Sequence, residues 1–225
     1  MVNHQYNELI NNTKPARVLG EISEYVKLVK RMYRVGMIAF HKTAVATNGI
    51  FCVHKSDTTL RCIIDARLAN QHFIKPPDVA LPTPSNLAAL HISPTDTMYM
   101  CKMDLSNYYH HLGLPAWMQP YFALPALPVA QIDTKLVRQY GGIELYPCCT
   151  TLPMGFSHAV YIAQQVHNNV LYRSAALNPA YNILNMTVPI LTAPVNMLYI
   201  DGNAIIGVNK QQVQEQYDKC IQAAC

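Results

Sequence analysis

The amino-acid sequence predicts an α+β fold, in which short strands and helices follow one another without strict alternation. Two observations carry this prediction: hydrophobic residues recur at helical spacing in several segments, and β-prone runs bounded by turn residues lie between those segments. Of the 225 residues, 51% are hydrophobic and 13% are charged, as in a globular protein whose core could support one large domain or two smaller lobes.

The first part of the chain is expected to form a helix and a pair of strands. Residues 1–20 are polar and lack a pattern, so we expect a loose lead-in. A helix is predicted over residues 23–36, where apolar residues lie at helical spacing and Gly36 ends the run. Strands are predicted at 49–54 and 60–66, joined by the turn-rich segment KSDTT. The apolar stripe of the helix is expected to contain Ile22, Val26, Val29 and Tyr33.

Further strands and helices are expected in the second part. An apolar strand is predicted at 97–104 and a helix at 156–173. An irregular crossover at 176–196 precedes a hairpin at 196–207, and residues 210–224 are predicted to form an amphipathic helix. The stripes of these two helices are expected to contain Ala159, Ile162, Val166 and Val170 in the first, and Val213, Tyr217, Cys220 or Ile221, and Ala224 in the second.

Charge and cysteine content narrow the class of protein. A net charge of +4 is too small to predict nucleic-acid binding by itself. Seven Lys and Arg residues lie between Lys14 and Lys42, which would suit a phosphate backbone, although a solvated helix face is the commoner meaning of such a run. The seven cysteines form no Cys-x-x-Cys pair, and we expect no signal peptide. We therefore expect reduced thiols in an intracellular protein, cytoplasmic or nuclear and not secreted, with no membrane partner.

The segment NMLYIDGNAIIG, residues 196–207, predicts a tight hairpin. Two β-prone runs flank Gly202 and Asn203, and these two residue types favour a two-residue turn. Tyr199 precedes this predicted turn, and Asp201 lies directly before Gly202. The hairpin therefore places a carboxylate at the end of an otherwise apolar strand.

Asp104 has a similar position, at the end of the apolar run MYMCKMD. A carboxylate at the tip of a core strand is costly unless it is exposed or bound to a cation. If the two strands are neighbours, Asp104 and Asp201 converge on one site, and such a site in polymerases holds two Mg²⁺ ions for in-line displacement. For each aspartate alone, capping a turn is the commoner role.

Four segments, in order, resemble the fingers and palm of a reverse transcriptase (RNA-directed DNA polymerase) from a retrotransposon-type element, over about residues 21–225. FCVHKSDTTLRCIIDARLAN resembles the fingers hairpin, and KMDLSNYYHHLGLP resembles the first catalytic block. YPCCTTLPMGFSHAVYIAQ resembles the Leu-Pro-x-Gly block, and LYIDGN resembles the Tyr-x-Asp-Asp hairpin. The resemblance implies a right-hand polymerase fold with an antiparallel palm sheet packed on helices.

The same resemblance implies how the chain is divided. A fingers-like lobe is expected over residues 21–95, and a palm-like lobe with the metal site over 96–225. A segment around 116–150 is expected to return to the fingers. A thumb is expected to be missing, so that the chain would be a fragment of a longer polymerase.

The resemblance also assigns site residues. Asp104 and Asp201 would be catalytic and would hold metal together with the Leu105 carbonyl, with two Mg²⁺ ions as cofactor and Mn²⁺ as a possible substitute. Lys55 and Arg61 would bind the incoming deoxynucleoside triphosphate. The implied partners are an RNA or DNA template with its primer. Structural polar residues of the fingers block are matched by Asp65, Arg67 and Asn70.

Three more residues are expected near the nucleotide. Tyr109 matches an aromatic residue beneath the sugar, where its ring would exclude a ribose 2′-hydroxyl, whereas viral RNA-dependent RNA polymerases usually place an acid there. Core packing is the rival interpretation of Tyr109 and the favoured one for Tyr108. Met154 stands where relatives often carry Gln or Phe, and Gly155 would let the backbone approach the base pair closely.

Gly202 departs from the family, which has a second acid at this position. One fewer carboxylate predicts weaker metal binding and impaired rather than absent chemistry. The alternative is a catalytically inactive, nucleic-acid-binding relic of a reverse transcriptase. A cysteine- and histidine-rich metal protein is disfavoured, because the nine His and seven Cys lack ligand spacing.

Overall fold

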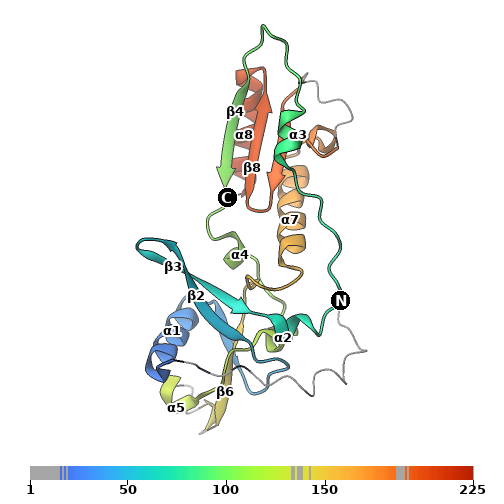
Figure 1. Ribbon diagram of the computed structural model, residues 1–225. Coiled ribbons are helices and arrows are strands. Elements are labelled where there is room, and N and C mark those ends of the chain that lie inside the picture. Colours follow the sequence, from blue (N-terminus) through green and yellow to red (C-terminus); the bar gives the residue numbers. More distant parts are fainter. Residues whose placement is uncertain are drawn as a thin grey trace. The chain divides into compact units, whose positions relative to one another are not determined.

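The structure is a computed structural model, and its ribbon follows the chain from blue to red (Figure 1). The lead-in expected over residues 1–20 lies almost entirely outside the described residues. The structure describes residues 16, 18, 20–132, 135, 139–141, 143–185, 191 and 193–224.

The chain divides into two compact units, each built from segments that are far apart in the sequence. This division differs from the expected boundary near residue 95, because residues 77–95 cluster with the second unit. The segment that returns to the first unit, 109–159, is also wider than the expected 116–150. The first unit contains Met1–Pro76 and Tyr109–Ala159, and the second contains Pro77–Tyr108 and Val160–Cys225.

The described elements of the first unit are α1 (Ile22–Arg34), β1 (Ile38–His41), β2 (Gly49–Ser56), β3 (Thr59–Asp65), α2 (Arg67–Asn70), η2 (Gln119–Phe122), β5 (Leu127–Pro128), α5 (Val129–Ile132) and β6 (Glu144–Cys149). Those of the second unit are α3 (Pro84–Ala88), β4 (Tyr99–Asp104), η3 (Val170–Ser174), η4 (Pro179–Tyr181), β7 (Val195–Tyr199), β8 (Gly202–Gly207) and α8 (Lys210–Ala224). Two helices cross the division: α4 (Tyr108–His111) and α7 (Ala159–Asn169).

Antiparallel pairing joins the strands in both units. In the first unit, β2 and β3 form a hairpin, and β1, β6 and β5 form a separate three-stranded sheet. The hairpin was predicted from the sequence, but β1 and β6 were not. These two strands pair Ile38 with Cys149, far along the chain, and Pro147 interrupts the β-prone run of β6. The predicted α+β class is confirmed as a mixed α/β structure with antiparallel sheets.

Helix α1 agrees with the predicted limits but buries a different stripe. Val29 is fully buried, whereas Ile22 and Tyr33, also expected inside, are 48% and 41% exposed. The shift is explained by Tyr25, whose ring is buried. Its hydroxyl donates a hydrogen bond of 2.7 Å to the Pro125 carbonyl, so the polar end of the side chain is satisfied inside the core.

Aromatic rings fill the centre of the first unit. Phe73, Phe122 and Phe156 contact one another with ring centroids 4.9–5.9 Å apart. His158 stacks on Phe156 at 5.0 Å and is 1% exposed. Burial lowers the pKa of the His158 imidazole below its ordinary value of 6.5.

Replacing His158 with phenylalanine is expected to make the fold less sensitive to acid. Below about pH 6.5 the unfolded chain gains a proton that the folded imidazole does not, so the free energy of unfolding falls as the pH falls. The His158→Phe variant lacks this contribution and keeps an aromatic ring. Urea unfolding at about pH 7.5 and about pH 5.5 measures the effect. Equal losses of stability in both proteins would contradict it.

The second unit is built on a sheet with the strand order β4–β8–β7. Helix α8 matches the predicted residues 210–224 and lies against one face of this sheet (Figure 1). Its buried stripe contains Val213 and Cys220, whereas Ile221 is 37% exposed. The core on the α8 face includes Met103, Leu171, Leu198, Ile205, Val213 and Cys220. A second core cluster contains Ile183, Leu191, Val195, Ala204 and Ile206, packed against Leu87 and Leu90.

Within the described part of the chain, no helix combines the length and the apolar character that a bilayer crossing requires.

Candidate functional site

The two aspartates expected to act together lie at one edge of the second unit's sheet. Asp104 is the last residue of β4, and the register places it opposite Gly202, the first residue of β8. Asp201 directly precedes Gly202, and its carbonyl accepts a hydrogen bond of 3.0 Å from the Leu105 amide. The strand end and the hairpin loop are therefore tied together by their backbones. The Asp104 side chain is exposed and that of Asp201 is half-buried.

The end of the edge strand β4 that carries Asp104 is exposed. Along β4, Met100 and Lys102 alternate with more buried residues and lie on the same exposed face as Asp104. Tyr199 on β7, paired with Gly202, is 50% exposed. The carboxylate of Asp104 is therefore accessible from solvent within the second unit.

The hairpin turn differs from the predicted one. Because Tyr199 pairs with Gly202, the two loop residues are Ile200 and Asp201, while Gly202 and Asn203 belong to β8. Asn203 is 2% exposed and its amide contacts the Cys220 sulfur at 3.8 Å, so it is a core residue rather than a turn residue.

Ile200 adopts a left-handed backbone, with φ of 55°. The adjacent Asp201 is not among the positive-φ residues, and this combination is the pattern of a type II′ turn, which favours glycine at the first position. A β-branched residue there is strained. The loop therefore needs support from the surrounding structure.

Helix α7 provides this support through two buried polar side chains. Gln164 donates from Nε2 to the Leu198 carbonyl at 3.2 Å and accepts at Oε1 from the Ile200 amide at 2.8 Å. His167 contacts the Ile200 carbonyl through Nδ1 at 2.9 Å. Both backbone groups of the strained residue are thereby fixed, which holds Asp201 in place.

The sequence did not indicate this role, because the expected stripe of the helix was apolar. Among its members Ala159 is buried, but Ile162 and Val166 are only half-buried, whereas Gln164 and His167 are 3% and 0% exposed. Burial lowers the pKa of the His167 imidazole, against an opposing effect of its contact with Ile200. The sequence did contain one signal for such a role: Gln164 and His167 are polar and lie three positions apart, on the same side of the predicted helix.

Replacing Gln164 with alanine is expected to destabilise the second unit by about 1–3 kcal/mol, because a buried carbonyl and a buried amide lose their partner. The neighbouring Gln165 is exposed, so Gln165→Ala should change stability by no more than about 0.5 kcal/mol. Urea unfolding of both variants measures the difference. Equal stability of the two variants would contradict the supporting role of Gln164.

The donors at this edge fit a magnesium-like cation better than a transition metal. Within the described residues, no group of three or more His, Cys, Asp and Glu side chains forms a metal site. Mg²⁺ is commonly bound by one or two carboxylates, with waters and substrate phosphates completing its shell. Asp104 and Asp201 offer that set of oxygen donors. Zn²⁺ would need additional nitrogen or sulfur ligands.

The predicted triphosphate-binding residues lie in the first unit, on the β2–β3 hairpin. Lys55 falls in a β-bulge between the pairs His54–Leu60 and Ser56–Thr59. Arg61 pairs with Val53, and the side chains of both Lys55 and Arg61 are exposed. A bulge redirects the side chains of its strand, and both cations are accessible to a charged ligand.

Gly155 and Met154 pack against the base of that hairpin. The Ile64 amide donates to the Met154 carbonyl at 3.3 Å. Asn70 fastens the same loop, donating to the Gly155 carbonyl at 3.0 Å and accepting from the Ser157 amide at 2.9 Å. The match of Asn70 to a structural polar residue therefore agrees with its contacts.

The conformation of Gly155 gives a structural reason for this glycine. Its φ is 115°, and a Cβ atom there would lie closer to the Ile64 carbonyl oxygen than any real Cβ contact allows. The close approach seen in the structure is to the protein's own backbone. The expected approach to a base pair stays a prediction.

Replacing Gly155 with alanine is expected to lower the free energy of unfolding by more than about 2 kcal/mol, through both backbone strain and the clash with Ile64. Gly36→Ala is the matched control, because Gly36 has φ of 74° but open space around its Cβ position. It should cost only about 1–2 kcal/mol, the strain of a left-handed alanine. Thermal or urea unfolding of the two variants separates the backbone strain from the clash with Ile64. Identical losses in the free energy of unfolding would contradict the clash.

The two tyrosines after the first carboxylate have different surroundings. Tyr108 is 7% exposed, and its hydroxyl donates to the Ala163 carbonyl at 2.9 Å. Its ring also lies 5.7 Å from that of His167. The interpretation of Tyr108 as a core residue is confirmed. Tyr109 is half-buried and belongs to the first unit.

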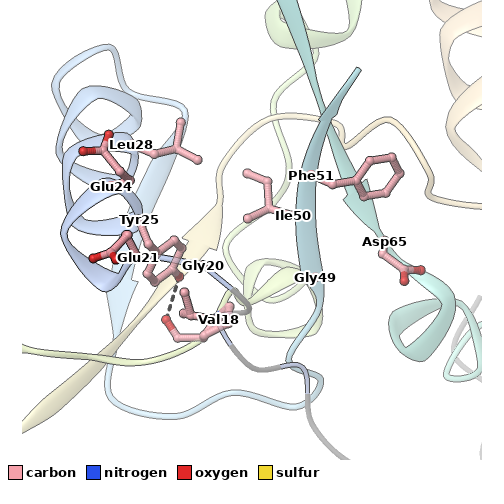
Figure 2. A pocket seen from close by; sticks show the side chains of 11 residues that line it. Val18, Gly20, Glu21, Glu24, Tyr25, Leu28, Gly49, Ile50, Phe51 and Asp65 are labelled. Carbon is pink, nitrogen blue, oxygen red and sulfur yellow. Dashed lines mark hydrogen bonds between the residues drawn. The ribbon is translucent and has the colours of Figure 1, made fainter. Parts of the chain in front are cut away.

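A cavity of about 420 Å³ lies in the first unit, between α1 and the β2–β3 hairpin (Figure 2). Two of its carboxylates already have protein partners: Asp65 pairs with Arg67 at 2.6 Å and Glu24 with Lys27 at 2.6 Å. The hydrogen bond from the Tyr25 hydroxyl to the Pro125 carbonyl joins two residues that line the cavity (Figure 2). The remaining walls are mainly apolar.

Comparison with known proteins supports the fold. Neither a protein-family model nor a curated protein matches the sequence. Among solved structures, the foamy viral protease–reverse transcriptase in complex with double-stranded DNA is similar, with a TM-score of 0.57 and 17% sequence identity. The similarity covers 93% of this chain but 31% of the viral chain. The fold therefore resembles that of a reverse transcriptase.

Proposed function

We propose that the chain is a template-directed nucleotidyltransferase, specifically the RNA-directed DNA polymerase of a retroelement. The observation that carries the proposal is the position of Asp104 and Asp201 at one edge of the β4–β8–β7 sheet. It occurs in a fold similar to that of a reverse transcriptase whose solved complex contains double-stranded DNA.

The residues suit phosphoryl transfer, which depends on positioning and charge neutralisation more than on covalent chemistry. Asp104, Asp201 and the Leu105 carbonyl would hold the cations. Two divalent ions bound there would neutralise the developing charge and stabilise the attacking and leaving oxygens. Lys55 and Arg61, both exposed, would bind the triphosphate, and Met154 and Gly155 would line its approach. Tyr109 would select deoxynucleotides by excluding the 2′-hydroxyl.

A second candidate is an inactive, nucleic-acid-binding relic, and Gly202 is the observation that favours it. Gly202 faces Asp104, and a Cβ atom there would lie 3.7 Å from the Asp104 Oδ1 atom. A carboxylate at this position would lie beside that of Asp104. The site has glycine instead, which leaves fewer anionic donors for a cation.

Primer extension tests the proposal. The full chain is incubated with an RNA template, a DNA primer and deoxynucleotides, with Mg²⁺, with Mn²⁺ or with a chelator. Metal-dependent extension, with little use of ribonucleotides, is the expected result. The relic predicts no extension, together with duplex binding that weakens steeply with salt and is unchanged by the chelator. That second pattern would overturn the proposal of activity.

A further inference from the structure

The β2–β3 hairpin carries two thiols in direct opposition. The register pairs Cys52 of β2 with Cys62 of β3, and their sulfur atoms lie 3.2 Å apart. Cys52 is exposed and Cys62 is partly exposed, so small reagents can reach the pair. Directly opposed residues of antiparallel strands have Cβ atoms about 4.5–5.5 Å apart, slightly wider than the 3.5–4.5 Å of most disulfides.

We propose that Cys52 and Cys62 are an oxidisable dithiol that closes into a cross-strand disulfide on reaction with a hydroperoxide. The inference concerns this hairpin alone and does not depend on the proposed polymerase function. The remaining adjustment is small, because the two sulfur atoms already touch and need only approach to the bond length of about 2.05 Å.

The environments of the two thiols indicate which of them reacts with the hydroperoxide first. Burial, reinforced by the hydrogen bond to Cys52, raises the pKa of the Cys62 thiol to about 11, so this thiol is mostly protonated near neutral pH. Cys52, the more exposed thiol, is therefore the one that attacks the peroxide.

The two steps balance. In the first, the Cys52 sulfur attacks one peroxide oxygen and forms an S–O bond while the O–O bond breaks, so that sulfenic acid forms on Cys52 and an alcohol or water carrying the thiol proton leaves. In the second, the Cys62 sulfur attacks the Cys52 sulfur and releases water, with the Cys62 proton leaving on the departing hydroxyl. Overall, two thiols lose two electrons and two protons, and the hydroperoxide is reduced.

Other described thiols lack this arrangement. Cys101 contacts the Gln214 carbonyl oxygen at 3.9 Å, and Cys220 contacts the Asn203 amide. Cys148 and Cys149 are adjacent and buried.

The hairpin face that holds the pair is directed toward α1. Ile50 lies two residues before Cys52, on the same face of β2, and points toward the helix (Figure 2). Arg31 of α1 is close enough for its positive charge to favour the Cys62 thiolate, although burial has the larger effect. This charge favours loss of the Cys62 proton in the second step, in which Cys62 attacks the Cys52 sulfur.

The test is peptide mapping of the oxidised full chain. Trypsin cleaves after Lys42, Lys55, Arg61 and Arg67, which places Cys52 in residues 43–55 and Cys62 in residues 62–67. After hydrogen peroxide treatment and alkylation of free thiols, these two peptides should appear cross-linked and should separate on reduction. The link should form at least about tenfold faster in the folded chain than in urea, because the fold pre-orients the sulfurs.

Cys101 is the internal control and should stay alkylatable under the same conditions. Cys52→Ser and Cys62→Ser should each abolish the cross-linked peptides. The proposal is overturned if Cys52 and Cys62 remain fully alkylated in the folded chain, if Cys52 couples elsewhere, or if the link forms no faster in the folded chain than in urea.

Discussion

Replacing Asp104 with asparagine is expected to lower metal-dependent nucleotide incorporation at least about 10³-fold. The substitution keeps the shape of the side chain and removes one of two carboxylates at the edge of the sheet. Metal ions contribute several kcal/mol of transition-state charge stabilisation, and each 1.4 kcal/mol corresponds to about a tenfold change in rate. Because Asp104 is exposed at a strand end, folding should be little affected.

The measurement is primer extension at saturating metal, with Asp96→Asn as the matched control. Asp96 is an exposed acid of the same unit, in a turn where its amide bonds the Ser93 carbonyl, and its loss should leave the rate unchanged. Terbium(III) luminescence, excited through tyrosine, gives a second readout, because Tyr199 lies beside the loop and Tb³⁺ also prefers oxygen ligands. An Asp104→Asn protein that retains both activity and terbium binding would refute the role of this carboxylate.

Local patterns in the sequence predicted the elements that place the site. The apolar run before Asp104 marked β4, and the amphipathic spacing of residues 210–224 marked α8, because both signals need only a few neighbouring residues. The β2–β3 hairpin was predicted for the same reason. The fold similarity to a reverse transcriptase agrees with the family resemblance that the four segments suggested.

The sequence did not predict features that depend on contacts between residues far apart along the chain. Gly202 and Asn203 are residue types that favour a turn, yet the turn lies earlier in the chain, at Ile200 and Asp201. Asn203 is instead a core residue that contacts Cys220. Gln164 holds the strained Ile200 in place through its backbone amide. The positions of Gln164 and His167 are likewise set by a loop more than thirty residues away. Residue propensities describe only local preferences, so they cannot predict that distant side chains will stabilise a strained loop residue.

The structure also changes the meaning of Gly202. From the sequence, glycine here would preserve a turn. In the structure it is the first residue of β8, faces Asp104 and has a negative φ, so no left-handed backbone requires it. Its Cβ position lies 3.6 Å from the Tyr199 carbonyl oxygen and 3.7 Å from the Asp104 carboxylate, which are ordinary contact distances. A larger side chain therefore fits, and the fold does not require glycine at this position.

Replacing Gly202 with aspartate is expected to raise affinity for Mg²⁺ by about 10- to 100-fold. Even groups that only hydrogen-bond to metal ligands change affinity by about this factor, and a third carboxylate would act on the cation directly. Without metal, three adjacent carboxylates repel one another and the variant should be less stable than the wild type. With saturating Mg²⁺ the order should reverse, because a tenfold gain in affinity adds about 1.4 kcal/mol to the stability of the bound form.

Gly202→Asn is the matched control, since it has the same shape as aspartate without the charge. It should show neither the loss of stability in chelator nor the gain in Mg²⁺. Thermal unfolding with and without metal, and terbium titration, measure both effects, and primer extension then tells whether the added acid raises turnover. If Gly202→Asp and Gly202→Asn bind metal equally weakly, the carboxylates of Asp104 and Asp201 do not share a cation, because a third charge beside a working pair must strengthen its hold on the ion.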